Sequence, residues 1–189
     1  MKIYYADIRG IDEEKALFPA LSANKGSAFG ISLLAAAYND YCGASLPVIS
    51  RLFRGKPFFA ENPNLHFSIS HSRTHVLCAL SSEPVGADTI DHRILRRESI
   101  ERLAAPEELE QLAIHEIWAL RESFFKLTNE GDLRTLRFTM AEGVIIPPRP
   151  DVYCRLYEDI EDSSTAFCAF CDDFPETLIK IPTKKLLKK

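Results

Sequence analysis

The sequence contains no apolar run long enough to cross a membrane and no detectable internal repeat. Its longest nearly apolar stretch, Ile31–Tyr38, is interrupted by Ser32 and stops at Asn39 and Asp40. A membrane-spanning helix needs about 20 consecutive apolar residues. The first residues, Met1–Asp7, have no basic segment followed by a long apolar core, so we expect no secretory signal. We therefore expect no membrane partner.

The chain also lacks the excess of positive charge that is typical of nucleic-acid-binding proteins. Its 189 residues carry 27 acidic and 23 basic side chains, for a net charge of −4. Because nucleic-acid backbones attract lysine and arginine, this balance argues against a nucleic-acid partner. Five lysines gather between Lys180 and Lys189. A basic run at a terminus is usually solvated and frayed, so we expect a basic tail over residues 176–189.

The cysteines provide neither a disulfide framework nor a zinc site. The chain has five of them, an odd number, which together with the absence of a signal predicts reduced thiols and a cytoplasmic location. Cys168 and Cys171 form a C-x-x-C pair, but they lie in an apolar, strand-like run where residues three apart face opposite sides. No second pair completes a zinc site, so we interpret both as buried core cysteines.

The remaining composition, 46% hydrophobic and 26% charged, is that of a globular protein, and its apolar periodicity predicts an α+β fold. Helices are expected over Ile11–Leu21, Lys25–Tyr41, Ile90–Leu103 and Pro106–Leu127. The last has proline at its first position and ends at Asn129–Gly131. An opening strand is expected over Lys2–Ile8. A C-terminal antiparallel sheet is expected from Leu136–Thr139, Val144–Ile146, Val152–Tyr157, Thr165–Cys171 and Leu178–Ile181.

The stretch from Gly55 to Asp88 combines strand-like periodicity with polar side chains. From Leu65 to Ser70, apolar and polar residues alternate, which predicts a strand with one buried and one polar face. The apolar run Val76–Leu80 follows after a short polar stretch, so we expect a hairpin with His71 at its turn end. Asp88 then follows a glycine and an alanine, which leaves space beside its carboxylate.

A second informative stretch lies on the longest predicted helix. Trp118, Glu122 and Lys126 are four residues apart and therefore form one stripe, so an acid and a base can face a cleft together. Each residue also has an ordinary structural interpretation: a turn aspartate at Asp88, and a surface ion pair between Glu122 and Lys126.

Together these stretches resemble the surfactin-synthetase-activating type of 4′-phosphopantetheinyl transferase. The shared features are Gly-Lys-Pro at Lys56, the His-Phe-Ser-Ile-Ser-His-Ser run containing His71, Val-Gly-Ala-Asp ending at Asp88, and Trp-Ala-Leu-Arg-Glu-Ser-Phe-Phe-Lys ending at Lys126. The match covers roughly residues 50–175. It implies two similar α+β halves with antiparallel sheets in a pseudo-twofold arrangement, with the active site in the cleft between them. We expect these halves at residues 1–83 and 84–175, and a monomer.

The resemblance implies that a serine of an acyl or peptidyl carrier protein attacks the β-phosphate of coenzyme A, releasing adenosine 3′,5′-bisphosphate in a Mg²⁺-dependent reaction. Asp88 and Glu122 correspond to the metal ligands. Glu122 also corresponds to the general base, and Lys126 to the group that stabilises charge on the departing bisphosphate.

The same resemblance assigns phosphate contacts to Lys56, Ser70 and His71. Near the 3′-phosphate, where relatives carry a basic cluster, this chain offers Lys25 and Ser27, with Arg51, Arg54 and Arg73 as candidate substitutes. A further departure is Ile90, because many relatives have a second acid at that position. Either a water occupies the third metal position, or the chain bends and brings in Asp91.

Three other functions are compatible with parts of the sequence. A non-catalytic member of this fold would bind coenzyme A or a carrier protein without transfer, as Ile90 would allow. A hydrolase would use Ser70 or Ser72 with His71 and Asp88, but no G-x-S-x-G turn surrounds them. A transition-metal site of His71, His75 and Cys78 lacks a fourth ligand at a customary spacing.

Overall fold

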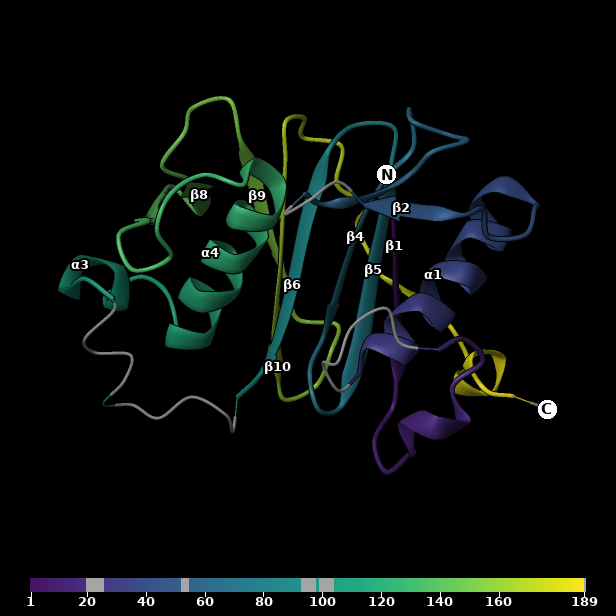
Figure 1. The fold of residues 1–189 in the computed structure, drawn as a ribbon. Helices are drawn as coiled ribbons and strands as arrows, with labels where there is room; N and C mark the ends of the chain where they lie inside the picture. Colours follow the sequence, from purple (N-terminus) through teal and green to yellow (C-terminus); the bar gives the residue numbers. More distant parts are fainter. Residues whose placement is uncertain (20–25, 52–54, 93–97, 99–103, 189) are drawn as a thin grey trace.

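Two β-sheets lie side by side in the structure, and each is covered by one long helix (Figure 1). The structure is a computed structural model and describes residues 1–19, 26–51, 55–92, 98 and 104–188. Helix α1 (Ser27–Cys42) packs on the first sheet and α4 (Ile114–Thr128) on the second. The α+β class predicted from the sequence is confirmed.

The first sheet has the strand order β11-β1-β5-β4. Its members are β1 (Lys2–Asp7), β4 (His66–His71), β5 (His75–Ser81) and β11 (Ile179–Lys180). Strands β4 and β5 form the predicted hairpin, with His71 opposite Val76 in the last pair before the turn. The hairpin therefore presents His71 at its turn end, as its sequence pattern predicts.

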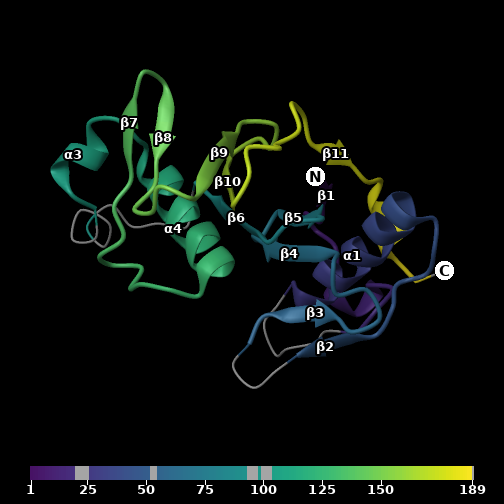
Figure 2. The same cartoon turned by 90° about the horizontal axis from the view of Figure 1, so that it is seen from above.

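The second sheet has the order β6-β10-β9 and is antiparallel throughout. Its strands are β6 (Val85–Asp91), β9 (Tyr153–Tyr157) and β10 (Ser163–Ala169). Two small hairpins lie outside the main sheets: β2 (Ile49–Arg51) with β3 (Pro57–Phe59), and β7 (Thr139–Ala141) with β8 (Val144–Ile146). In the view from above they lie on opposite sides of the molecule (Figure 2).

The two sheets meet where β4 lies beside β6. The hydroxyl of Ser68 accepts a hydrogen bond from the backbone N–H of Ala87 at 3.0 Å, and the hydroxyl of Ser70 accepts one from Thr89 at 3.3 Å. Both serines are buried. The predicted contrast between one buried and one polar face is therefore wrong at these two serines, because β6 covers them and its N–H groups bond to their hydroxyls.

Apolar side chains fill both sheet–helix layers and the space where the sheets join. One cluster packs α1 on the first sheet, and a second packs α4 on the second sheet. A third contains residues of both sheets, among them Ile3, Leu77, Val85 and Phe167. The sheets thus share buried apolar surface, which fixes their relative position.

Several predicted helix boundaries are wrong. The helix expected over residues 11–21 is reduced to a 3₁₀ turn, η1 (Glu13–Lys15), within the described part of that segment. The helix expected from Ile90 is replaced at its start by the end of β6, whereas residues 93–97 and 99–103 lie outside the described residues. The long helix from Pro106 divides into α3 (Pro106–Leu109) and α4, which ends as predicted at Asn129 in the left-handed conformation. Leu109, expected in the core, is 39% exposed because it lies on α3.

The C-terminal segment is ordered rather than frayed. Strand β11 pairs in parallel with β1, with Tyr4 opposite Ile179, and is not part of the C-terminal sheet. A 3₁₀ turn, η2 (Thr183–Leu186), follows, and Leu186 is fully buried against α1 and β1. The expected solvated tail is wrong because the apolar residues between the lysines pack on the first sheet. No helix within the described ranges is long and apolar enough to cross a membrane.

Gly86 sets how closely β6 and α4 approach each other. A Cβ atom at Gly86 would lie 1.9 Å from the carbonyl oxygen of Ser123 and 2.7 Å from the backbone nitrogen of Leu127, both in α4. Neither backbone atom can move without moving the helix. This contact explains why the residue two positions before Asp88 is glycine.

We predict that Gly86→Ala destabilises the protein by at least about 2 kcal/mol, because an inserted methyl group in a packed interior forces backbone shifts. Urea denaturation would measure the change in the free energy of unfolding. The control is Gly10→Ala, since Gly10 has open space around its Cβ position and only its positive φ of 72° opposes the substitution. Equal losses in both variants would contradict the predicted clash.

Candidate active site

Three elements bring predicted phosphate-binding, metal-binding and catalytic side chains together. Strand β4 carries His71, β6 carries Asp88, and α4 carries Glu122. These three line one cavity of about 270 Å³ together with Ser72, Thr89, Ile90, Asp91 and Trp118. Side chains from β4, β6 and α4 thus meet at one site, although His71 and Glu122 are 51 positions apart in the sequence.

Lys126 is bonded to both strands at this site. Its Nζ donates to Asp88 Oδ1 at 2.6 Å, to the Ser70 hydroxyl at 3.2 Å and to the carbonyl oxygen of Ala87 at 3.1 Å. The Ser70 hydroxyl in turn donates to Asp88 Oδ1 at 2.7 Å. An ammonium, a hydroxyl and a carboxylate therefore form one network at the seam of β4 and β6.

Glu122 lies one helical turn before Lys126 and is half-buried. Among the described residues it has no hydrogen-bond or ion-pair partner. Burial, followed by repulsion from the Asp88 carboxylate, raises the pKa of Glu122, and attraction to Lys126 partly offsets this. Its carboxylate is consequently a stronger proton acceptor than an ordinary surface glutamate. The surface ion pair that the i,i+4 spacing suggests does not form; Lys126 pairs with Asp88 instead.

His71 packs against the start of α1. A Cβ atom on Gly26 would lie 2.7 Å from Nδ1 of the His71 ring, so the ring lies directly over that glycine. Burial and repulsion from Lys126 lower the pKa of His71, while Glu13 and Asp88 act in the opposite direction. The ring is therefore predominantly neutral near pH 7. Ser27 lines a cavity of about 310 Å³ with His71, whereas Lys25 lies outside the described residues.

Glu13 is a residue near the site that the sequence did not reveal. Its Oε1 accepts a hydrogen bond from the backbone N–H of Ala28 at 3.0 Å, in the first turn of α1. It also lines, with Gly26, His71 and Arg73, a cavity of about 730 Å³. No motif or spacing connects Glu13 to α1, so only the folded chain reveals this contact.

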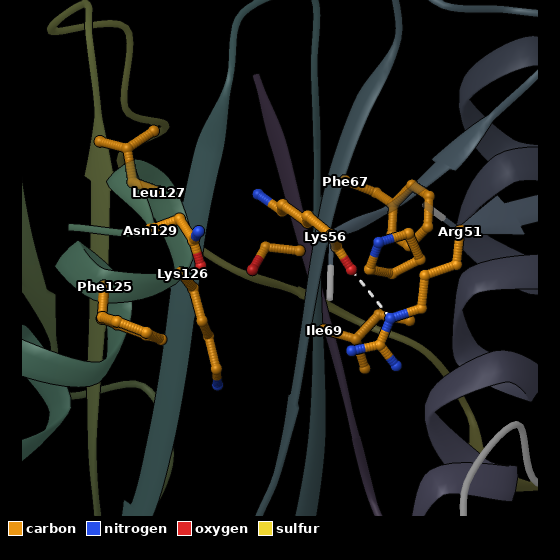
Figure 3. A pocket seen from close by; sticks show the side chains of 11 residues that line it. Arg51, Lys56, Phe67, Ile69, Phe125, Lys126, Leu127 and Asn129 are labelled. Atoms are coloured by element: carbon orange, nitrogen blue, oxygen red, sulfur yellow. Dashed lines mark hydrogen bonds between the residues drawn. The ribbon is translucent and has the colours of Figure 1, made fainter. Parts of the chain in front are cut away.

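Lys56 and Lys126 line a further cavity, of about 560 Å³ (Figure 3). The Nζ of Lys56 donates to the carbonyl oxygen of Val85, so the ammonium group is surrounded by protein although the side chain as a whole is exposed. Desolvation and then repulsion from Lys126 lower the pKa of this ammonium. The apolar wall consists of Pro57, Phe67, Ile69, Phe125 and Leu127.

The three arginines named as substitutes for the missing basic cluster have different positions. Arg51 lines the cavities of Lys56 and of Ser27, and its Nε donates to the carbonyl oxygen of Gly55 at 2.8 Å. Arg73 is exposed beside the cavity that contains Glu13. Arg54 lies outside the described residues. Arg51 is therefore the arginine that best fits a role near Ser27.

The carboxylates at this site fit a magnesium ion held by two protein ligands. Asp88 and Glu122 face the same cavity, and both known side-chain bonds to Asp88 end on Oδ1. Mg²⁺ is commonly held by one or two carboxylates, with waters and substrate phosphates in its other positions. Within the described ranges, no group of three or more histidine, cysteine, aspartate or glutamate side chains could hold a metal. A protein-only metal cage is thus not present in that part of the chain.

Asp91, the residue proposed to replace the acid that is missing at Ile90, does not take that place. Ile90 is 9% exposed and belongs to the apolar cluster under α4. The chain does not bend after Asp88, since β6 continues to Asp91. Asp91 instead accepts hydrogen bonds from Arg73, Thr74 and Ser163.

Two of the alternative sites lose support from the geometry. The Ser70 hydroxyl donates to Asp88 rather than to His71, so no serine–histidine pair forms there. Cys78 is fully buried within the first sheet, and Nδ1 of His75 bonds to the Thr74 hydroxyl at 2.9 Å. These contacts favour neither a serine hydrolase nor a transition-metal site.

We predict that magnesium lowers the apparent pKa of Glu122. In the metal-free protein this pKa lies above its ordinary value of 4.5, so the carboxylate loses its proton only as the pH rises through the higher value. A cation beside the carboxylate favours the ionised form and shifts the transition to lower pH. NMR titration of the side-chain carboxyl carbon, with and without magnesium, would measure this. In Asp88→Asn the metal-free pKa should fall and the response to magnesium should disappear; an unchanged response would contradict a shared site.

Comparison with known proteins identifies several similar transferases. The chain is 30% identical to 4′-phosphopantetheinyl transferase Sfp of Bacillus subtilis (strain 168) over 152 residues, covering 70% of this chain and 67% of that protein. It is 28% identical to the 4′-phosphopantetheinyl transferase ffp of Bacillus subtilis over 151 residues, with 70% and 67% covered. A third relative, a 4′-phosphopantetheinyl transferase of Bacillus subtilis, is 28% identical over 138 residues, with 62% of its length covered. No protein-family model matches the chain.

Proposed function

The chain belongs to the 4′-phosphopantetheinyl transferase family and is an enzyme of that family, and from this premise we propose which reaction its site performs. A serine hydroxyl of an acyl or peptidyl carrier protein attacks the β-phosphorus of coenzyme A. The bond from that phosphorus to the bridging oxygen breaks, and adenosine 3′,5′-bisphosphate leaves. The serine proton passes to the enzyme, and the 4′-phosphopantetheine arm remains on the carrier.

The observation that carries this proposal is the network of Lys126, Asp88 and Ser70 beside Glu122. It places a cation, two carboxylates and a hydroxyl at the seam of two strands and one helix. A diphosphate carries negative charge that must be neutralised before an oxygen nucleophile can attack. The network supplies positive charge next to a proton acceptor.

Glu122 acts as the general base in this proposal. A base is most effective when its pKa lies near the working pH, and burial beside Asp88 moves the pKa of Glu122 in that direction. It has no partner within the described residues, so its carboxylate is available to the serine hydroxyl, directly or through a water.

Lys126, His71 and Lys56 hold the phosphates and the leaving bisphosphate. Lys126 donates from the centre of the network and stabilises charge on the departing group. His71 offers a neutral ring N–H donor beside the start of α1. Lys56 and Arg51 supply positive charge along the neighbouring cavity, where the nucleotide end can lie. Magnesium, held by Asp88 and Glu122, would supply further positive charge to the diphosphate.

The wider organisation implied by the family is also part of the proposal. Residues 1–83 would form the half that contacts coenzyme A, and residues 84–175 the half with metal and catalytic groups. A pseudo-twofold relation of these halves would be consistent with one sheet and one long helix in each, with β11 of the C-terminal segment added to the first sheet. Because the site is built within one chain, a monomer would be sufficient for activity. We place this enzyme in the cytoplasm as part of the same proposal.

The test is intact-mass analysis of an apo carrier protein incubated with coenzyme A, magnesium and this protein. The proposal predicts a mass increase of one phosphopantetheine arm that depends on all three components. A second candidate is a non-catalytic member of the fold. Two features favour it: Ile90 stands in place of an acid, and the carboxylate of Glu13 lies at the start of α1, where relatives carry a basic cluster. Binding of coenzyme A without modification of any of several carriers would support that second candidate.

A further inference from the structure

Asp91 is a buried carboxylate at the end of β6 that joins segments of both sheets. Its Oδ2 accepts from the backbone N–H of Arg73 at 2.9 Å, and its Oδ1 accepts from the Thr74 hydroxyl at 2.5 Å and the Ser163 hydroxyl at 3.2 Å. Arg73 and Thr74 form the turn between β4 and β5, whereas Ser163 begins β10. One side chain therefore connects the hairpin of the first sheet to two strands of the second.

The turn that Asp91 holds directly follows His71 and behaves as one unit. The N–H of Ser72 donates to the carbonyl oxygen of His75 at 2.8 Å. The hydroxyl of Ser72 accepts from the N–H groups of Thr74 at 3.2 Å and His75 at 3.1 Å. Because these bonds tie the turn together, its position relative to β6 determines where His71 lies in the cavity.

The partners of Asp91 indicate that it supplies geometry in addition to stability. It is 6% exposed, and among the described residues no lysine or arginine pairs with it. Burial raises the pKa of Asp91, but hydrogen bonding to Ser72, Thr74, Arg73 and Ser163 lowers the pKa by a larger amount. The net pKa is below its ordinary value, so the group stays ionised. A buried carboxylate is costly, and a neutral side chain could end the strand at lower cost. A carboxylate accepts hydrogen bonds on both of its oxygens, and a neutral side chain of the same size cannot accept on both.

We propose that Asp91 is a positioning residue that holds the β4–β5 turn, and thereby His71, in place against the cavity shared by Asp88 and Glu122. It stands next to the position of the missing second acid, but it acts through the turn and does not bind the metal. This inference rests on the function proposed above, because the consequence of placing His71 is correct contact with a phosphate of coenzyme A.

The test is Asp91→Asn, which keeps the shape but leaves one acceptor oxygen for donors on two sides. We expect the KM for coenzyme A to rise about tenfold, while kcat at saturating coenzyme A falls less than about threefold, because a displaced contact costs binding before it costs chemistry. The magnesium concentration that gives half-maximal rate should not change. An unchanged KM would overturn the proposal, and a parallel rise in the magnesium requirement would show that Asp91 is a ligand.

Ser163→Ala is the matched control, because it removes a hydrogen bond to the same carboxylate from β10 and leaves the turn bonded. It should destabilise the protein to a similar extent in urea denaturation but change the KM for coenzyme A less than about twofold. A rise in KM equal to that of Asp91→Asn would mean that stability, not positioning, explains the effect.

NMR of the free protein separates failure of this inference from failure of the proposed function. The His71 ring resonances should shift in Asp91→Asn and stay in place in Ser163→Ala, whether or not any carrier is modified. Shifted resonances without transfer by the wild type would retain the positioning role and reject the transferase. If the wild type is active and the His71 resonances of Asp91→Asn do not shift, only the positioning role is rejected.

Discussion

Replacing Glu122 with glutamine is expected to lower the rate of phosphopantetheine transfer by about two to four powers of ten, which is the usual contribution of a general base. Glutamine has nearly the same shape but cannot accept the serine proton, and it provides a weaker metal ligand. Intact-mass kinetics with an apo carrier at saturating coenzyme A and magnesium would measure the rate.

The fold of Glu122→Gln should be retained, and at neutral pH its stability should be equal to or slightly above that of the wild type. The reason is that the raised pKa of Glu122 makes its ionised form unfavourable in the metal-free folded state above that pKa. Glu107→Gln is the control, since Glu107 is exposed on α3, and it should leave the rate unchanged. A wild-type rate in Glu122→Gln would remove this residue from the chemistry.

Replacing Arg121 with methionine is expected to destabilise the protein by about 3–5 kcal/mol, because the buried carboxylate of Glu108 loses its buried cation and, among the described residues, keeps only the exposed Arg137, whose Nε lies 3.7 Å from Oε2. Arg121 is 1% exposed and its Nη2 donates to Glu108 Oε2 at 2.7 Å. Its Nη1 donates to the carbonyl oxygen of Leu133 at 3.1 Å. Glu108, equally buried, also accepts from the backbone N–H groups of Ala105 and Phe138. The pair therefore ties α3 and the segment after α4 to α4 itself.

Urea denaturation at neutral pH would measure the loss in Arg121→Met. Adding Glu108→Gln should restore about 1 kcal/mol or more, because a buried neutral amide costs less than a buried carboxylate that has lost Arg121. Arg134→Met, at an exposed position, should change the free energy of unfolding by less than about 0.5 kcal/mol. A loss in Arg121→Met as small as in this control would contradict a stabilising role for the buried pair.

The Trp118–Lys126 stretch thus contains two adjacent residues with different roles. Glu122 faces the cavity, whereas Arg121, one position earlier, points to the interior and bonds to Glu108. Helical geometry places neighbouring residues about 100° apart, so one motif can serve the site with one face and the fold with another. The sequence pattern predicted the stripe of Trp118, Glu122 and Lys126, but it contained no sign that α3 supplies the partner of Arg121.

Four features could be predicted from the amino-acid sequence: the α+β class, the β4–β5 hairpin with His71 at its end, the C-terminal end of α4 and the family resemblance. These features depend on local periodicity, on turn and capping residues, and on ordered motifs, all of which can be read along the chain. It also placed Asp88, Glu122 and Lys126 as neighbours, and the structure brings them together.

The partners of these side chains became known from the folded chain and not from the sequence. Lys126 pairs with Asp88 rather than with Glu122, Ser70 lies buried under β6, and Asp91 bonds to a turn. The C-terminal segment joins the first sheet, although its lysines suggest a free tail. Each outcome depends on which strand or helix covers a given face, and such long-range packing leaves no periodic signal in the sequence.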